Sequence, residues 1–407
     1  GEGRAVASPR RPPRPARAAG GAGSSVTAAA LPPLALYLHV PWCVRKCPYC
    51  DFNSHGQGGP IPEERWVARV LEDLGLAAAD AAGRTVESVF FGGGTPSLLS
   101  PAAVGAVLEG IAARLPIAAE AEITLEANPG TAEADRFAGY RGAGVNRLSL
   151  GIQSFSDRAL AALGRIHDAG EAHRAVALAR GAGFERLNLD LMHGLPGQRV
   201  DEGLADLEAA LALEPEHLSW YQLTIEPNTV FHVRPPTLPV EEVLGDLEDA
   251  GFARLADAGF ERYEVSAWSR PGGACRHNLG YWTFGDYLGV GPGAHGKVSR
   301  PGAGGLEVVR TRRTRTPEDW FGSGEPPRVL REPVAATALP GEFLLNALRL
   351  VEGVPEGLLE ARTGVSLERV RPTLDALRRE GLLRGDRLAT TPRGLRFLDR
   401  VTGAFLA

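Results

Sequence analysis

Short apolar runs alternate with amphipathic stretches along most of the chain. Helical spacing of apolar residues is present near 63–80 and near 101–114, in each case after an apolar run. Strands that alternate with helices predict an α/β fold with a parallel sheet and right-handed crossovers. Because six or seven such units can be counted, the pattern favours a partial (β/α)6-type barrel over a closed eight-fold one. The runs expected to be strands are 35–40, 86–94, 122–130, 146–155, 186–197, 217–228 and 262–269.

The last part of the chain has a different pattern. Residues 300–340 are rich in Pro, Gly and Arg, and we expect them to connect the barrel, 34–299, to a small unit at 341–407. In that unit "EFLLNALRL" and "LERVRPTLDALRREGLL" have helical spacing, and "LLRGDRLATTPRG" is typical of a two-stranded wing. These features predict a helical, winged-helix-like C-terminal domain. The charge run "RTRRTR" at 310–315 is expected to be a solvated loop.

Composition narrows the classes of function. Residues 1–33 contain almost no large apolar side chain, so we expect a disordered leader there. The formal net charge of −5 lacks the basic footprint of a nucleic-acid-binding protein. There is no window of 18 consecutive apolar residues and no tripartite signal peptide, which indicates a cytoplasmic protein without a membrane-spanning segment.

Three of the four cysteines lie together in "CVRKCPYC", as Cys43, Cys47 and Cys50. In a reducing compartment such a cluster indicates metal binding or redox chemistry rather than disulfides. A structural zinc ion is one alternative, but it requires a fourth protein ligand; Cys275 is distant and His55 lies outside a standard zinc spacing. The spacing C-x3-C-x2-C also suits a [4Fe–4S] cluster with one iron left open, as a catalytic cluster needs.

The cysteine spacing, together with Tyr49 just before the last cysteine and a position after the first strand, resembles the radical S-adenosylmethionine (SAM) enzymes. In that family SAM chelates the open iron through its amino and carboxylate groups, and one-electron reduction cleaves it to methionine and a 5′-deoxyadenosyl radical. Polar and glycine residues at the ends of several strands are also typical of a binding site at a barrel mouth. The resemblance implies SAM contacts at Tyr37, Tyr49, Gly93, Gly94, Thr95, Glu126, Gln153, Arg165 and Asp190.

Several longer stretches resemble one branch of the family. "LYLHVPWC", "FGGGTPS", "LEANPG", "LSLGIQSF" and "LDLMHGLPG" are similar to oxygen-independent coproporphyrinogen III oxidases and to the HemW-like haem chaperones. The oxidases carry a fourth cysteine two residues after the third, where this chain has Phe52, whereas the HemW-like branch carries H-N-x-x-Y-W, here "HNLGYW". Both features favour the chaperone branch. The haem contacts that the resemblance implies are His277, Asn278, Tyr281 and Trp282, and the axial ligand is open between His277, Cys275 and His295.

The function expected from this resemblance is binding of haem as cargo and its transfer to an acceptor haemoprotein. The implied acceptor is respiratory, which includes membrane-bound enzymes, and we expect no nucleic-acid partner and a monomer or weak dimer. The alternative is an enzyme that oxidatively decarboxylates the propionates of coproporphyrinogen III. Phe52 and "HNLGYW" count against that alternative.

Overall fold

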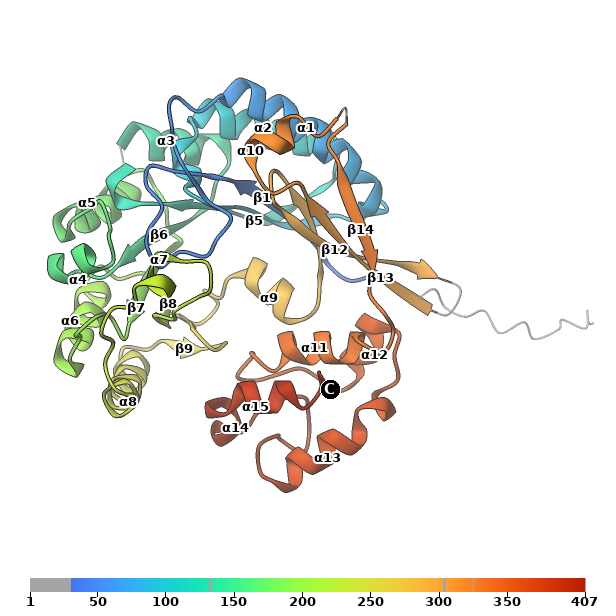
Figure 1. The fold of residues 1–407 in the computed structure, drawn as a ribbon. Helices are drawn as coiled ribbons and strands as arrows, with labels where there is room; N and C mark the ends of the chain where they lie inside the picture. The colour runs from blue at the N-terminus through green and yellow to red at the C-terminus, as the bar shows by residue number, and fades with distance from the viewer. Residues whose placement is uncertain (1–30, 132–133, 303–304, 325, 407) are drawn as a thin grey trace, which may run out of the picture.

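The computed structural model describes residues 31–131, 134–302, 305–324 and 326–406 (Figure 1). The expected leader at 1–33 lies outside the described residues except for its last three. Within the described ranges, a sheet of 12 strands has the order β14-β13-β12-β11-β1-β4-β5-β6-β7-β8-β10-β9. Figure 1 shows this sheet curving, with most helices along its outer side.

The centre of the sheet confirms the predicted parallel α/β architecture. Six neighbouring strands pair in parallel, and most of their residues are buried, as expected when helices cover one face and other segments the second. They are β1 (Leu34–Val40), β4 (Val86–Gly93), β5 (Ile117–Ala127), β6 (Arg147–Gln153), β7 (Leu187–His193) and β8 (His217–Gln222).

The crossover helices lie between successive parallel strands. Their apolar sides pack with the strands in one core that includes Trp66, Val70, Leu108 and Phe137, all nearly inaccessible to solvent. The helices on this outer side are α1 (Glu63–Ala78), α2 (Pro101–Ala112), α3 (Ala134–Ala143), α4 (Asp157–Ala162), α5 (Ala169–Gly181), α6 (Val200–Leu211) and α8 (Glu241–Asp257).

The seventh apolar run, 262–269, does not form a further parallel unit. It is divided into β9 (Glu261–Arg262) and β10 (Ala267–Ser269), which extend the sheet antiparallel beside β8. Between them the Glu264 carboxylate accepts hydrogen bonds from the Ser266 backbone N–H (3.1 Å) and hydroxyl (3.0 Å), which holds a turn. The turn reverses the chain after β9, so β10 returns antiparallel between β9 and β8.

The stretch 300–340, expected to be a connecting region, contains structured elements of the main sheet. After β11 (Asp286–Val290), which pairs in parallel with β1, the strands β12 (His295–Gly302), β13 (Gly305–Arg313) and β14 (Val329–Pro333) continue antiparallel, and α10 (Pro317–Phe321) lies between the last two. The expectation of a solvated loop at 310–315 is therefore wrong for its first four residues.

The alternation of buried and exposed side chains explains why this charge run forms a strand. Along β13, Thr311 and Arg313 are buried while Arg312 is exposed, so one face is solvated and the other is packed. The Arg313 guanidinium is 2.9 Å from the carboxylate of Asp73 on α1, and both side chains are buried. A buried arginine is tolerated here because it has this partner.

The C-terminal unit is helical, as predicted. It consists of α11 (Leu339–Ala347), α12 (Gly357–Thr363), α13 (Arg371–Arg379), α14 (Pro392–Arg396) and α15 (Leu398–Gly403). An antiparallel bridge between Leu383 and Thr390 occupies the expected wing. The core of this unit also includes Phe284 and Val308 from the barrel side. Figure 1 shows the unit below the open side of the curved sheet.

Candidate functional site

The cysteine loop leaves the carboxyl end of β1 and crosses the mouth of the barrel. Its ends are held together because β2 (Trp42–Cys43) pairs in parallel with β3 (His55–Gly56). Inside the loop the Cys50 N–H donates to the Cys47 carbonyl at 3.1 Å. Near its middle, the backbone N–H of Phe231 donates to the Pro48 carbonyl at 3.0 Å, which fastens the loop to α7 (Val230–Val233).

All three loop cysteines line one cavity of about 480 Å³. The structure brings the predicted SAM residues to the same cavity, with the exception of Tyr37, which lines a neighbouring one. The predicted residues that line the smaller cavity are Tyr49, Gly93, Gly94, Thr95, Glu126, Gln153, Arg165 and Asp190. Sequence analysis missed Asn128, Ser149 and Tyr221 in this cavity, since an isolated polar residue on a strand carries no distinctive pattern.

Among the described residues, no group of three or more His, Cys, Asp or Glu side chains converges as it would around a single metal ion. A tetrahedral zinc site requires such convergence. In a cubane cluster each thiolate binds a different iron, so its ligands lie around a body rather than around a point. The thiols of the cysteine loop therefore suit a [4Fe–4S] cluster in number and kind.

Arg165 is placed between the cysteine loop and the barrel wall. Its Nη1 lies 3.6 Å from the Cys47 sulfur, while its Nη2 donates to the Asn128 side chain at 2.6 Å and to the Gly151 carbonyl at 2.7 Å. Its Nε is buried and has no hydrogen-bond partner within the described ranges. The guanidinium thus contacts the Cys47 sulfur and retains a donor for a polar ligand.

Burial raises the pKa of the Cys43 and Cys50 thiols, although Thr95 and Ser54 respectively donate hydrogen bonds that lower it in part. In the chain alone these two thiols therefore keep their protons more firmly than an exposed thiol does. Metal binding displaces such protons, so loading of a cluster at this loop is coupled to proton release.

The glycines of "FGGGTPS" allow a close approach of backbone to the site. Gly93 has φ of +113°, and a Cβ there would lie 2.5 Å from the His39 ring. A Cβ on Gly94 would collide with the Trp42 carbonyl. Since the Thr95 N–H also donates to that carbonyl at 2.7 Å, the end of β4 is fixed directly against the cysteine loop.

Two carboxyl groups face the same cavity from β5 and β7. Burial and the charge of Asp190 raise the pKa of Glu126 to about 8, although the Gly93 N–H, 3.2 Å away, opposes the shift. Burial also raises the pKa of Asp190, against hydrogen bonds from Asn188 (2.8 Å) and Ser149 (3.1 Å). The charge of Arg147 also opposes the shift of the Asp190 pKa. Two buried carboxyls at one cavity fit a ligand that brings an amino group and hydroxyls, as SAM does.

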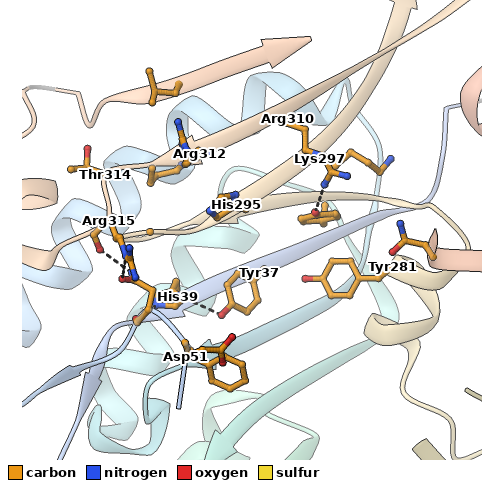
Figure 2. Close-up of a pocket in the computed structure, with 18 of the residues that line it drawn as sticks. Tyr37, His39, Asp51, Tyr281, His295, Lys297, Arg310, Arg312, Thr314 and Arg315 are labelled. Carbon is orange, nitrogen blue, oxygen red and sulfur yellow. Dashed lines mark hydrogen bonds between the residues drawn. The ribbon is translucent and has the colours of Figure 1, made fainter. Parts of the chain in front are cut away.

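A second, larger cavity of about 1000 Å³ adjoins the first (Figure 2). The two cavities share four lining residues, Asp51, Phe52, Gly93 and Glu126, which we call the shared wall. Tyr37 lies in the larger cavity with its hydroxyl 3.0 Å from His39 Nδ1. Tyr281 and Trp282 line it as well, on α9 (Arg276–Trp282).

The histidine of "HNLGYW" has no ring nitrogen available for iron. His277 is 2% exposed; its Nδ1 is 2.9 Å from the Ser88 hydroxyl and its Nε2 is 2.9 Å from the Tyr281 hydroxyl. Its ring stacks on Phe90 at 4.9 Å, and burial lowers its pKa to about 3. His277 and Asn278 line neither of these two cavities. In this structure His277 is a core residue that orients Tyr281.

The two remaining candidates for axial ligand differ in exposure. Cys275 is fully buried with its sulfur 3.3 Å from a Glu122 carboxylate oxygen, and burial raises its pKa to about 11. His295 is exposed at the start of β12 and lines the larger cavity. Arg310, Arg312 and Arg315 line it too, and sequence analysis missed them because it assigned them to a solvated loop.

The comparisons with known proteins agree with this site. Residues 37–210 match the Radical SAM superfamily, and residues 334–397 match the HemN C-terminal domain. A solved structure of coproporphyrinogen III oxidase (HemN) from Escherichia coli superposes with a TM-score of 0.78 and 20% identity, covering 92% of this chain and 90% of that one, which shows a shared fold. The fold and the cysteine loop thus define a radical SAM protein, a class that carries a [4Fe–4S] cluster and SAM.

Full-length relatives narrow the class to one family. The chain is 52% identical over 379 residues to Heme chaperone HemW of Escherichia coli (strain K12), covering 93% of this chain and 99% of the relative. It is 46% identical over 384 residues to Heme chaperone HemW of Haemophilus influenzae, covering 92% and 98%. The chain belongs to the HemW family, which confirms the resemblance stated from its motifs. No helix in the described ranges has the length and apolar character needed to cross a membrane.

Proposed function

We propose that this protein is a haem chaperone, which binds haem as cargo and passes it to an acceptor haemoprotein. The observation that carries this proposal is the similarity over nearly the whole chain to relatives named haem chaperones. The cavity of about 1000 Å³ beside the cysteine loop supports it, because that volume lies at the upper end of small-molecule sites, about 300–1,000 Å³.

In the proposed holoprotein Cys43, Cys47 and Cys50 would hold the [4Fe–4S] cluster through their thiolates. When bound, the cluster and SAM supply one-electron reductive chemistry. The chain's own part is to bind and orient: the backbone at Gly93, Gly94 and Thr95 offers a surface without side-chain obstruction for the methionine moiety. Tyr49 packs beside Phe231 with ring centres 6.3 Å apart, which holds its ring at the loop.

Four polar residues complete the proposed SAM site. Glu126 and Asp190 would accept from the amino group and hydroxyls, and Arg165 offers its Nε–H, which no described residue accepts. Gln153 is held in position although it has φ of +70°, because its side-chain oxygen accepts from the Tyr221 hydroxyl at 2.8 Å. A strained residue that its neighbours hold in this way is typical of a binding site.

Phe52 favours the chaperone over decarboxylation of coproporphyrinogen III. It stands where the oxidases that the chain resembles carry a further cysteine, and its side chain is 62% exposed on the shared wall. The acceptor we propose is a respiratory haemoprotein, met in the cytoplasm or at the inner face of a membrane, by a chaperone that is a monomer or weak dimer.

Transfer of haem tests the function directly. Anaerobically reconstituted protein loaded with haem is mixed with membrane vesicles that contain a haem-free respiratory cytochrome, and the acceptor's haem spectrum is followed. We expect transfer that is faster than from an equal concentration of free haem. In parallel, reduced protein is incubated with SAM and coproporphyrinogen III. Accumulation of protoporphyrinogen would show that the protein is a decarboxylase of coproporphyrinogen III and would reject the chaperone proposal.

A further inference from the structure

We infer that the haem cargo binds in the larger cavity, with His295 as an axial ligand of the iron and Arg312 and Arg315 as partners of the propionates. This inference rests on the proposed function and assigns its site. Of the three axial ligands that the sequence left open, His277, Cys275 and His295, it selects the last.

The larger cavity has the surfaces that a porphyrin needs. Tyr37, Tyr281 and Trp282 supply aromatic area on the side of β1 and α9, and Tyr287 extends it, 4.6 Å from Tyr281 between ring centres. Flat aromatic side chains favour a flat apolar ligand. The side formed by β12 and β13 is basic, so one wall is aromatic and the other is cationic (Figure 2). Haem has the same division, with an apolar macrocycle and two carboxylates on one edge.

His295 has the properties of a free axial ligand. Its side chain is exposed at the cavity and makes no hydrogen bond to any described residue that could occupy its nitrogens. Partial burial and the charges of Arg312 and Arg310 lower its pKa, so the ring is neutral at physiological pH. A neutral imidazole is the form that binds iron. In Figure 2 the ring lies between the β13 arginines and the two tyrosines, Tyr37 and Tyr281.

The charge of the cavity wall matches the propionates. The basic residues Lys297 and Arg313 are already committed to buried partners, Asp286 at 2.7 Å and Asp73 at 2.9 Å. Arg312 is exposed and reaches its nearest carboxylate, Glu332, at only 3.7 Å.

Arg315 is also exposed. Within the described part of the chain the partner of its side chain is the Asn53 amide oxygen at 3.3 Å, not a carboxylate. Arg312 pairs directly across from His295 in the sheet, so a group that binds a carboxylate stands beside the iron ligand.

The position of the cavity also suits a function that involves the cluster. Phe52, Asp51, Gly93 and Glu126 form the shared wall, so a porphyrin in the larger cavity would lie directly beside the cysteine loop and the SAM site. Neither His277 nor Cys275 offers this position, because both are buried behind other side chains.

Two probes and three variants test the assignment in the full-length, cluster-loaded chain. The probes are haem, as ferric protoporphyrin IX, and metal-free protoporphyrin IX, which has propionates but no iron. The variants are His295→Ala, the double variant Arg312→Ala/Arg315→Ala, and His173→Ala as control, since His173 is an exposed imidazole on α5 that lines neither cavity. Anaerobic titrations give Kd, and the visible and electron paramagnetic resonance spectra report the axial ligand.

We expect His295→Ala to raise the Kd for haem about tenfold and to abolish the imidazole-ligated spectrum, with no change for metal-free protoporphyrin. The arginine double variant should raise the Kd for both probes about tenfold, because each lost charge-assisted contact is made to a propionate. His173→Ala should match the wild type with both probes.

Three results would overturn the inference and are separable from failure of the proposed function. If His295→Ala bound haem with the affinity and spectrum of the wild type, His295 would be excluded as the axial ligand. Saturable haem binding by the wild type would still support the proposed function. An equal loss of both probes in His295→Ala would mean that the residue does not act through iron. Unchanged Kd values in the arginine double variant would show that Arg312 and Arg315 do not bind the propionates. In contrast, absence of saturable haem binding by the wild type would reject the proposed function itself.

Discussion

Glu126 makes the chain less stable as the pH rises, and its replacement by glutamine should remove that effect. Its pKa is about 8 in the folded chain, compared with an ordinary value of 4.5. Because the folded state holds this proton more tightly than the unfolded state, stability falls between pH 4.5 and about 8 and the loss is complete above that range. Glutamine does not titrate and still offers an oxygen to the Gly93 N–H.

The size of the effect follows from the shift. At about 1.36 kcal/mol per pKa unit, the displacement sets an upper limit of about 5 kcal/mol. Glu126 lines two cavities and is only partly buried, so its ionised form keeps some hydration. We therefore expect Glu126→Gln to gain about 2–3 kcal/mol over the wild type between pH 5 and pH 9.

Urea unfolding of the cluster-free, SAM-free chain at about pH 5 and about pH 9, under reducing conditions, measures this gain. Glu122→Gln is the matched control on the same strand. Burial would raise the pKa of Glu122, but Arg147 and Arg186 outweigh it and lower the pKa, so its titration lies below this pH window. That variant should be destabilised by a similar amount at both pH values. If the wild type and Glu126→Gln lost stability in parallel between the two, the argument for a protonated Glu126 would fail.

Three further predictions concern the loop cysteines, a buried ion pair and the backbone at Gly93. Replacing any one of the loop cysteines by alanine should abolish iron and sulfide uptake, measured by chemical analysis, whereas Cys275→Ser should retain the cluster. Asp73→Ala breaks a fully buried ion pair and should lower the unfolding free energy by about 3–5 kcal/mol in urea, against less than about 1 kcal/mol for Asp249→Ala at an exposed pair. Gly93→Ala, at φ +113°, should lower the unfolding free energy by about 1–3 kcal/mol and weaken SAM binding in equilibrium dialysis. Gly56→Ala, where a Cβ would meet no atom within 4 Å, should change neither quantity.

The parallel strands could be predicted because each is a continuous apolar run bounded by glycine, proline or polar residues. This is the pattern of a strand buried on both faces. The strands at the β14 edge of the sheet could not be predicted in this way. β13 contains "RTRR" because one of its faces lines a polar cavity, and a single buried arginine, Arg313, is compensated by Asp73 from a helix 240 residues earlier in the chain. Sequence spacing carries no signal for such a distant partner.

The missing sequence signal for distant partners also explains why the SAM site could be predicted more fully than the haem site. The cysteine loop and the strand-end residues converge as expected, because the ends of parallel strands meet at one edge of the sheet. His277 remains a predicted haem contact, but in this structure Ser88, on a strand 189 residues away, lies at one ring nitrogen and Tyr281 at the other. Tyr281 and Trp282 of the motif line the larger cavity, but the motif carries no signal for the exposed imidazole of His295.

Glu126 links the two cavities electrostatically. Its carboxyl is on the shared wall, and in the chain alone it is protonated at neutral pH. A cationic amino group bound in the smaller cavity favours the ionised carboxylate, so it places a negative charge on the wall of the larger cavity. Carboxylates of a porphyrin in that cavity would then be repelled from Glu126 and drawn to Arg312 and Arg315. Occupation of the smaller cavity would thus turn the propionates of the cargo away from Glu126 and toward these arginines.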